Sequence, residues 1–164
     1  MLVAVIADTH LPRGSRRLPD PCVERLRTAD LILHAGDVVA VSFLDELCAL
    51  GPPVEAVFGN MDEPALKATL PKEHVVEAEG ARIGMVHIGG PAVGREERLA
   101  ARFRGCAAVV YGHSHIPQVE RVGGFWILNP GSPTERRRAP NRSMLELRIV
   151  RGEIEPTLVD LGRG

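Results

Sequence analysis

Short apolar runs alternate along the chain with polar, turn-rich segments, and this alternation predicts its strands. The first run, residues 2–7, contains only Leu, Val, Ala and Ile, which is the pattern of a strand buried on both faces. Two more apolar runs follow at residues 31–34 and 54–58. The segments between these three runs are long enough for helices. This arrangement favours parallel strands joined by crossover helices.

Two helices are predicted between these strands. The first covers residues 20–28, where Asp20 is the expected N-cap and Pro21 suits the first helical position. The second covers residues 41–50, with Ser42 as the expected cap and Gly51 as its end. These helices complete a strand–helix–strand–helix–strand unit in the first third of the chain.

The remainder of the chain is richer in strands. Glycine-containing turns between apolar runs predict three hairpins, which pair residues 75–78 with 82–87, 119–122 with 125–128, and 143–150 with 154–159. We also expect a helix over 95–103 and a buried strand over 107–111. Because no repeat, low-complexity tract or linker interrupts the chain, we expect one domain over residues 1–164.

Composition limits the function classes that remain. The 164 residues are 45% hydrophobic and 25% charged, as in one soluble domain with a sizeable core. No run approaches the roughly 20 apolar residues that cross a bilayer, so we expect no membrane contact. A formal net charge of −1 argues against a dedicated duplex-DNA binder with one large basic face.

The three cysteines carry no predicted chemistry. Cys22, Cys48 and Cys106 are an odd number and widely spaced, which excludes a disulfide framework or a thiolate zinc site. We expect buried free thiols and a cytoplasmic location.

Candidate chemistry lies where the predicted strands end. Five strand ends supply seven metal-type donors, which are Asp8, His10, Asp37, Asn60, His87, His113 and His115. In an open α/β sheet, ligands bind at the carboxyl ends of the strands, so we expect these side chains to meet on one rim. Residues two apart in extended chain point the same way, so Asp8 can share a site with His10, and His113 with His115.

The donor set predicts two metal ions rather than one. Seven oxygen and imidazole donors exceed what a single tetrahedral zinc needs, whereas two ions about 3.5–4 Å apart can share a carboxylate. Gly36, Gly59 and Gly112 each precede a donor, where the backbone must approach a crowded centre. Taken singly, each motif is an ordinary turn or cap. Independent turns would not place donors at five successive strand ends.

In combination, these residues resemble a known family. The ordered motifs Asp8-x-His10, Gly36-Asp37, Gly59-Asn60-x-Asp62, His87 and Gly112-His113-x-His115 resemble the calcineurin-like metallophosphoesterase superfamily. Asn129-Pro130-Gly131-Ser132 is similar to a motif of its small bacterial and archaeal phosphodiesterase branch. The resemblance implies an α/β fold, a four-layer αββα sandwich of two mixed β-sheets flanked by helices.

The resemblance also implies roles for the donors. The first ion would be held by Asp8, His10, Asp37 and His115, and the second by Asp37 as the bridge with Asn60, His87 and His113. The expected catalytic residues are Asp37, Asn60 and Asp62, the last of which would orient a neighbouring ligand. Asn129–Ser132 is expected to be a supporting turn, and His34 a buried histidine at a strand end.

Two positions depart from the common family pattern. Met61 stands where many relatives have a histidine that protonates the leaving group or contacts phosphate, and methionine does neither. His87 is followed by Ile88-Gly89-Gly90, so a second nearby histidine is absent.

The implied function is a di-metal phosphoesterase that hydrolyses phosphodiester bonds by attack of a metal-bridging hydroxide. Manganese is the first choice of metal, with iron, cobalt, nickel or zinc as alternatives. The implied partner is a small phosphodiester, reached through a shallow site because the chain has no room for a cap domain. A homo-oligomer is compatible with the resemblance.

Two alternatives remain. The first is a nuclease with the same centre, in which Arg136–Arg138 and Arg142 grip a phosphate backbone, although such a charge run is usually a solvated face. The second is a non-catalytic interaction scaffold, since a eukaryotic sorting-coat subunit of similar fold has a degraded centre. All seven donor positions are intact here, which favours catalysis.

Overall fold

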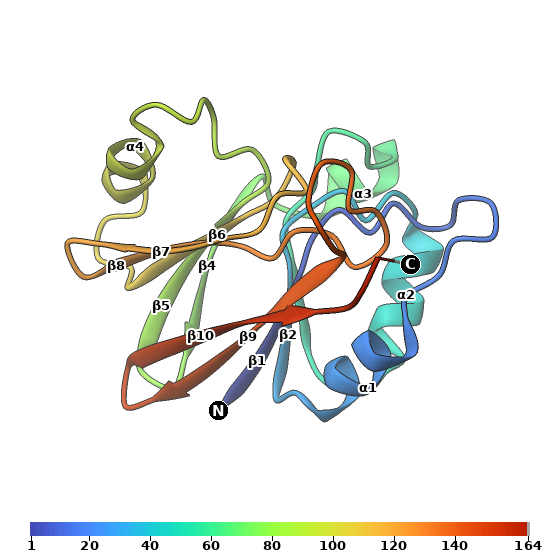
Figure 1. Cartoon of the computed structure of the whole chain (residues 1–164), viewed down its shortest axis with the longest axis horizontal. Helices are drawn as coiled ribbons and strands as arrows, with labels where there is room; N and C mark the ends of the chain where they lie inside the picture. Colours follow the sequence, from blue (N-terminus) through green and yellow to red (C-terminus); the bar gives the residue numbers. More distant parts are fainter. Residues whose placement is uncertain (164) are drawn as a thin grey trace.

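Two five-stranded sheets face each other in the computed structural model, which describes residues 1–163 (Figure 1). The first sheet has the strand order β10-β9-β1-β2-β3, and the second has the order β4-β5-β6-β8-β7. Helices α1 and α2 flank the first sheet, and α4 lies on the side of the second (Figure 1). The expected four-layer sandwich of two mixed sheets is confirmed.

The first sheet contains the predicted parallel unit. Its members are β1 (Leu2–Ile6), α1 (Asp20–Thr28), β2 (Leu31–His34), α2 (Val41–Cys48) and β3 (Val54–Ala56), followed at the far end of the chain by β9 (Ser143–Val150) and β10 (Glu153–Asp160). Ile6 pairs with His34, and His34 pairs with Ala56. Because of this register, β1, β2 and β3 end at the same level.

The second sheet contains the other predicted hairpins. Its members are β4 (Glu73–Ala78), β5 (Ala81–Val86), α4 (Arg95–Arg102), β6 (Ala108–Tyr111), β7 (Gln118–Val122) and β8 (Phe125–Asn129). The strands β5, β6 and β8 are parallel, with β4 and β7 antiparallel at the edges. Val86 pairs with Tyr111, so β5 and β6 also end at one level.

Apolar side chains fill three interfaces. The central core lies between the two sheets and includes Val5, Leu33, Met85 and Val110. A second cluster packs Leu26 of α1 and Leu47 of α2 on the outer face of the first sheet. A third packs Leu99 of α4 on the second sheet. Helices α1, α2 and α4 thus each bury an apolar face on a sheet.

The helix starts differ from the prediction. Pro19 and Ala40 occupy the N-cap positions of α1 and α2, and neither helix has a side-chain cap, so Asp20 and Ser42 are not caps. The N–H of Val41 instead donates to Glu63 Oε1 at 2.7 Å. A contact from a distant loop thus replaces the local cap that the pattern predicted.

Helix α3 (Pro64–Thr69) and the cysteines provide two further corrections. The sequence pattern did not predict this six-residue helix, which has Pro64 in its first turn and buries Leu66. The cysteines were expected to be buried, but Cys48 is exposed and Cys106 is half-buried. Among the described residues, no helix is long and apolar enough to cross a membrane.

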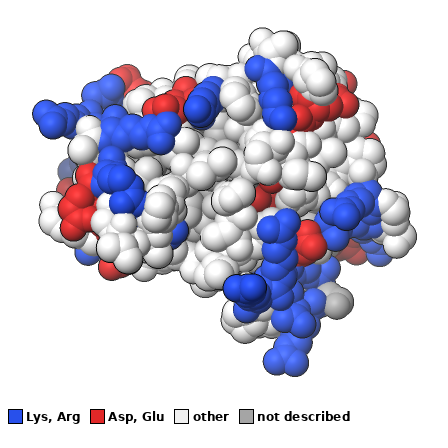
Figure 2. All heavy atoms as spheres, turned by 90° about the horizontal axis from the view of Figure 1, so that it is seen from above, with Lys and Arg blue, Asp and Glu red and all other residues white. Residues whose placement is uncertain are grey.

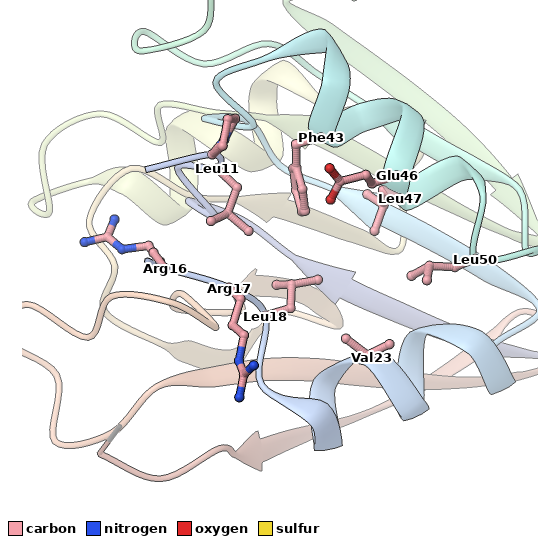
Figure 3. Close-up of a pocket in the computed structure, with 10 residues that line it drawn as sticks. Leu11, Arg16, Arg17, Leu18, Val23, Phe43, Glu46, Leu47 and Leu50 are labelled. Atoms are coloured by element: carbon pink, nitrogen blue, oxygen red, sulfur yellow. The ribbon is translucent and has the colours of Figure 1, made fainter. Parts of the chain in front are cut away.

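An apolar hollow of about 360 Å³ opens between α1 and α2. Figure 3 shows Leu18, Val23, Phe43 and Leu47 around it, with Arg16 and Arg17 on the neighbouring loop. None of the seven predicted donors lines this hollow.

Candidate metal centre

The seven predicted donors come together at the carboxyl ends of five strands. The pattern of strand ends predicts one rim of one sheet, but β1, β2 and β3 belong to the first sheet and β5 and β6 to the second. The N–H of Asp8 donates to Gly36 O at 3.0 Å, and the N–H of Gly112 donates to His87 O at 3.0 Å. These bonds fix the loops of each sheet, and the two sheets then face each other across the site.

One group of donors surrounds Asp8. Its Oδ1 lies 3.4 Å from His115 Nε2 and 3.9 Å from His10 Nε2. The two histidine Nε2 atoms are 3.3 Å apart, and all three side chains are buried. Three donor atoms at such distances converge on a common point, which is the geometry that an ion requires.

A second group of donors surrounds Asn60. Its Oδ1 lies 3.1 Å from His87 Nε2 and 3.0 Å from His113 Nδ1. His87 is buried, whereas Asn60 and His113 are exposed. This side of the centre is therefore open to solvent.

Asp37 lies between the two groups. Its Oδ2 is 3.6 Å from His10 Nε2 and 3.3 Å from His87 Nε2. One carboxylate oxygen thus faces a member of each group. The donor atoms of Asp8, Asp37 and His87 also lie within 4.8 Å of one another.

The remaining polar atoms of these predicted donors are held by the backbone. Asp8 Oδ2 accepts the N–H of His113, and Asp37 Oδ1 accepts the N–H of Met61, both at 2.8 Å. Asp8 Oδ1 is buried and has no hydrogen-bond partner among the described residues. A buried carboxylate oxygen without a partner is costly. A bound cation would satisfy it, so the residues present fit a metal.

The buried histidines are oriented in the same way. His87 Nδ1 lies 2.8 Å from Ala35 O, and His115 Nδ1 lies 2.9 Å from Glu135 O. If each Nδ1 carries the proton, each Nε2 presents its lone pair to the centre, as in known metal sites. Neither carbonyl partner was predicted, because Ala35 and Glu135 contribute only backbone atoms.

The backbone of the predicted donors is strained. Five of the seven predicted donors have positive φ angles of 48–70°, and they are Asp8, His10, Asp37, His113 and His115. Residues other than glycine rarely adopt such angles, and their concentration is typical of functional sites.

Glycines allow the close approach that the sequence predicted. A Cβ on Gly59 would lie 2.1 Å from Asp37 Oδ1, and a Cβ on Gly36, whose φ is +89°, would lie 2.6 Å from His87 Nδ1. Neither position accommodates a side chain without displacing a predicted donor.

Burial dominates the titration of the centre. It raises the pKa of Asp8 to about 7 and lowers the pKa of His115 to about 4. Burial also opposes ionisation of Asp37, but the hydrogen bond and charge of His87 outweigh it and lower the pKa of that carboxyl. In the absence of ions, the centre therefore disfavours the charged form of Asp8 and the protonated form of His115.

Residues around the donors hold the loops. Asp62, predicted to orient a ligand, accepts the N–H groups of Val39 at 2.6 Å and Gly59 at 2.7 Å. It therefore contacts backbone rather than a ligand side chain. Asn129 Nδ2 donates to Gly112 O at 3.0 Å and Ser132 Oγ to Asp8 O at 2.8 Å, as expected for a supporting turn.

His34 is a buried residue at the end of β2, as predicted. Its side chain is fully buried and its Nε2 lies 3.0 Å from Thr9 Oγ1. Burial lowers its pKa to about 3. His34 is therefore neutral near pH 7, and its contact with Thr9 supports the Asp8–His10 loop.

A small apolar pocket adjoins the exposed side of the centre. It has a volume of about 320 Å³ and is lined by Phe58, Val86 and Ile88 together with Asn60 and His87. Two cations, Lys72 and Arg102, also line it. No sequence pattern predicts this pocket, since its residues come from four separate segments.

Comparison with known proteins identifies the family. Residues 1–152 match the calcineurin-like phosphoesterase superfamily domain. A probable metallophosphoesterase of Methanothermobacter thermautotrophicus is 34% identical over 99% of this chain and 94% of its own length. Vps29 of Entamoeba histolytica, solved in complex with Zn²⁺, has a TM-score of 0.77 and 27% identity over 99% of this chain and 100% of that chain.

A structure described as a novel archaeal phosphodiesterase has the same fold, with a TM-score of 0.73 and 19% identity over 97% of this chain and 100% of that chain. The family match, the archaeal relative and the seven donors agree. The chain belongs to the calcineurin-like phosphoesterase superfamily, in its small archaeal and bacterial branch.

Proposed function

We propose that this chain is a di-metal phosphodiesterase that hydrolyses small phosphodiesters. The observation that carries the proposal is the position of Asp37, whose Oδ2 faces a histidine of each donor group at 3.6 and 3.3 Å. The first ion would be held by Asp8, His10, Asp37 and His115. The second would be held by Asp37, Asn60, His87 and His113.

When bound, two divalent ions lower the pKa of water to supply a hydroxide nucleophile and neutralise charge on the phosphate. The protein supplies the positioning. Backbone N–H groups hold Asp8 Oδ2 and Asp37 Oδ1, so that the other oxygen of each carboxylate faces the centre. The substrate phosphate would approach from the side of Asn60 and His113, which are exposed.

The small apolar pocket supports a diester as substrate. Phe58, Val86 and Ile88 offer apolar contact beside Asn60 and His87. One ester substituent of a phosphodiester would lie there while the phosphate reaches the centre. Lys72 at the same pocket would favour an anionic molecule, whereas the charge of Arg102 is compensated by its ion pair with Glu73.

We propose manganese as the metal, and the donor set is compatible with it. Carboxylate, amide and imidazole donors without a thiolate suit manganese, and also iron, cobalt, nickel or zinc. Elemental analysis of the purified protein, together with reconstitution by each metal, would identify the preferred ion.

The direct test is hydrolysis of bis-p-nitrophenyl phosphate, with p-nitrophenyl phosphate as the monoester comparison. We expect turnover of the diester with added Mn²⁺, loss of turnover with a chelator, and recovery when Mn²⁺ is restored. Asp37→Asn should abolish both metal binding and turnover, whereas Asp45→Asn, on the exposed side of α2, should change neither. Near-normal turnover by Asp37→Asn would refute the bridging role.

The similarity to Vps29 supports one alternative, a non-catalytic scaffold of the same fold. The same assay distinguishes the two functions. A scaffold would bind ions without turnover of any phosphodiester or phosphomonoester tested.

A further inference from the structure

A strongly basic groove lies beside the metal centre. It has a volume of about 760 Å³, and its lining includes Arg13, Arg16 and Arg17 from one loop, Arg136, Arg137 and Arg142 from another, and Arg163. We call it the arginine groove. The corresponding blue side chains gather at the lower right of the molecule in Figure 2. Glu135 is the acidic residue of the lining.

The arginine groove and the metal centre share a wall. Glu135, which lines the groove, accepts the Nδ1–H of the donor His115 through its carbonyl oxygen. Thr134, which also lines the groove, donates its hydroxyl to Thr9 O at 2.7 Å, between the donors Asp8 and His10. These two contacts place the groove directly beside the loops that carry Asp8, His10 and His115.

The positive charges of the groove are only partly compensated. Glu135 pairs with Arg16 at 3.4 Å and with Arg137 at 3.9 Å. Within the described residues, the side chains of Arg13 and Arg17 make no hydrogen bond or ion pair. Seven arginines against one glutamate leave a local charge of about +6 in a chain whose net charge is −1.

This arrangement changes the interpretation of the Arg136–Arg138 run. By itself, the run predicts a solvated face of a loop. In the structure, Arg136 and Arg137 line the same groove as arginines more than 100 residues earlier in the chain. Like charges brought together from distant segments repel each other, and an anionic ligand would relieve that repulsion.

The chemistry of the lining points to several phosphates on one strand. Arginine binds phosphate through two parallel N–H groups. No aromatic side chain lines the groove, so bases would not stack there. A volume of about 760 Å³ suits a few nucleotides of one strand rather than a duplex. The spread of arginines over two loops exceeds what a single phosphate requires.

We propose that the arginine groove binds the phosphate backbone of single-stranded nucleic acid, without sequence preference, and leads one of its phosphodiesters to the metal centre. Delivery to the centre rests on the proposed phosphodiesterase function. Binding in the groove does not, because no predicted metal ligand lines it.

The binding test uses the full chain, chelator, and a fluorescein-labelled oligothymidylate of about 12 nucleotides, within the site sizes of single-strand binders. Anisotropy should show binding that weakens as salt rises. The double variant Arg13→Gln/Arg17→Gln should bind at least about 10-fold more weakly at low salt, and the slope of log K against log salt should fall by about 1.4, for two lost phosphate contacts. The control Arg27→Gln/Arg148→Gln removes the same charge from exposed positions outside the groove and should bind as the wild type does.

A second arm tests delivery. In Mn²⁺, the unlabelled oligothymidylate should inhibit hydrolysis of bis-p-nitrophenyl phosphate competitively. Arg13→Gln/Arg17→Gln should keep the turnover of this small diester and lose most of the inhibition.

The groove assignment would be overturned if the wild type did not bind the strand, or if both double variants bound it equally weakly. It would also be overturned if ATP at an equal concentration displaced the strand, because the ligand would then be a small polyphosphate. Strand binding that depends on the groove, without any diester turnover, would support the groove and refute the phosphodiesterase function. Diester turnover without strand binding would support the phosphodiesterase function and refute the groove assignment.

Discussion

At the scale of residues, each carboxylate of the centre divides its two oxygens between backbone and site. Asp8 Oδ2 and Asp37 Oδ1 accept backbone N–H groups, which leaves Asp8 Oδ1 and Asp37 Oδ2 directed at the histidines. In His87 and His115, Nδ1 contacts a backbone carbonyl and Nε2 faces the site. The side chains are thus oriented by the fold, so the donor geometry exists before any ligand binds.

Also at the scale of residues, Met61 supplies no proton donor beside the centre. Its side chain is 55% exposed and carries no proton to donate. A leaving group would then depart without protonation from this position. We expect log kcat to fall steeply as the leaving-group pKa rises across a series of diesters, with aryl diesters far better than alkyl diesters. A flat dependence would show that another group donates the proton.

His34 provides a pH prediction. Its ordinary pKa of 6.5 is lowered by burial to about 3 in the folded protein, so its contribution to stability is present above pH 6.5 and is lost as pH falls toward 3. Between about pH 7.5 and 5, the wild type should lose about 2 kcal/mol more unfolding free energy than His34→Gln. Urea unfolding of both proteins in chelator measures this difference. Parallel losses in the two proteins would contradict it.

At the scale of elements, the loops after β2 and β3 are joined by one side chain. Asp62 accepts N–H groups from Val39 in one loop and Gly59 in the other. Val39 has a φ of 91°, which is strained for a β-branched residue. Asp62 is therefore a positioning residue that keeps Asp37 and Asn60 at their mutual distance.

Asp62→Asn tests this role. An amide accepts at one end only, so one of the two N–H groups would lose its partner. We expect Mn²⁺ affinity and kcat each to fall by about 10–100-fold, as for other residues that orient metal ligands. Metal titration and diester kinetics measure both values, with Asp45→Asn as the matched control. Lower unfolding free energy with unchanged Mn²⁺ affinity would mean that Asp62 only stabilises the fold.

At the scale of the whole molecule, the centre joins the two sheets. Asp8, His10, Asp37 and Asn60 follow strands of the first sheet, while His87, His113 and His115 follow strands of the second. Ions bound there would link both sheets through ligands that are far apart in the unfolded chain. Metal binding at this centre would therefore be coupled to folding.

This coupling predicts a thermal shift. At about 100 times its Kd, an ion that binds only the folded protein adds about 2.7 kcal/mol, which corresponds to roughly 5–10 °C in Tm for a chain of this size. Scanning calorimetry with Mn²⁺ and then with chelator should show the rise and its reversal. Asp37→Asn should show little rise. An equal rise in wild type and variant would place the ions elsewhere.

The sequence by itself determined the local parts of this protein. Apolar runs predict strands because burial on both faces excludes polar residues. The side chains that follow those strands indicate metal chemistry because they are oxygen and imidazole donors placed at the strand ends. Gly36 and Gly59 signal close backbone approach for the same local reason. The parallel β1-β2-β3 unit follows from the alternation of strands and helices.

Only the tertiary structure decided what depends on distant contacts. It divided the donor strands between two sheets, placed Asp37 Oδ2 between two donor groups, and gave Val41 a partner in Glu63 instead of a local cap. It also gathered arginines from both ends of the chain into one groove. Patterns along a sequence report the burial and turns of neighbouring residues, whereas these features arise from residues that meet only when the layers pack.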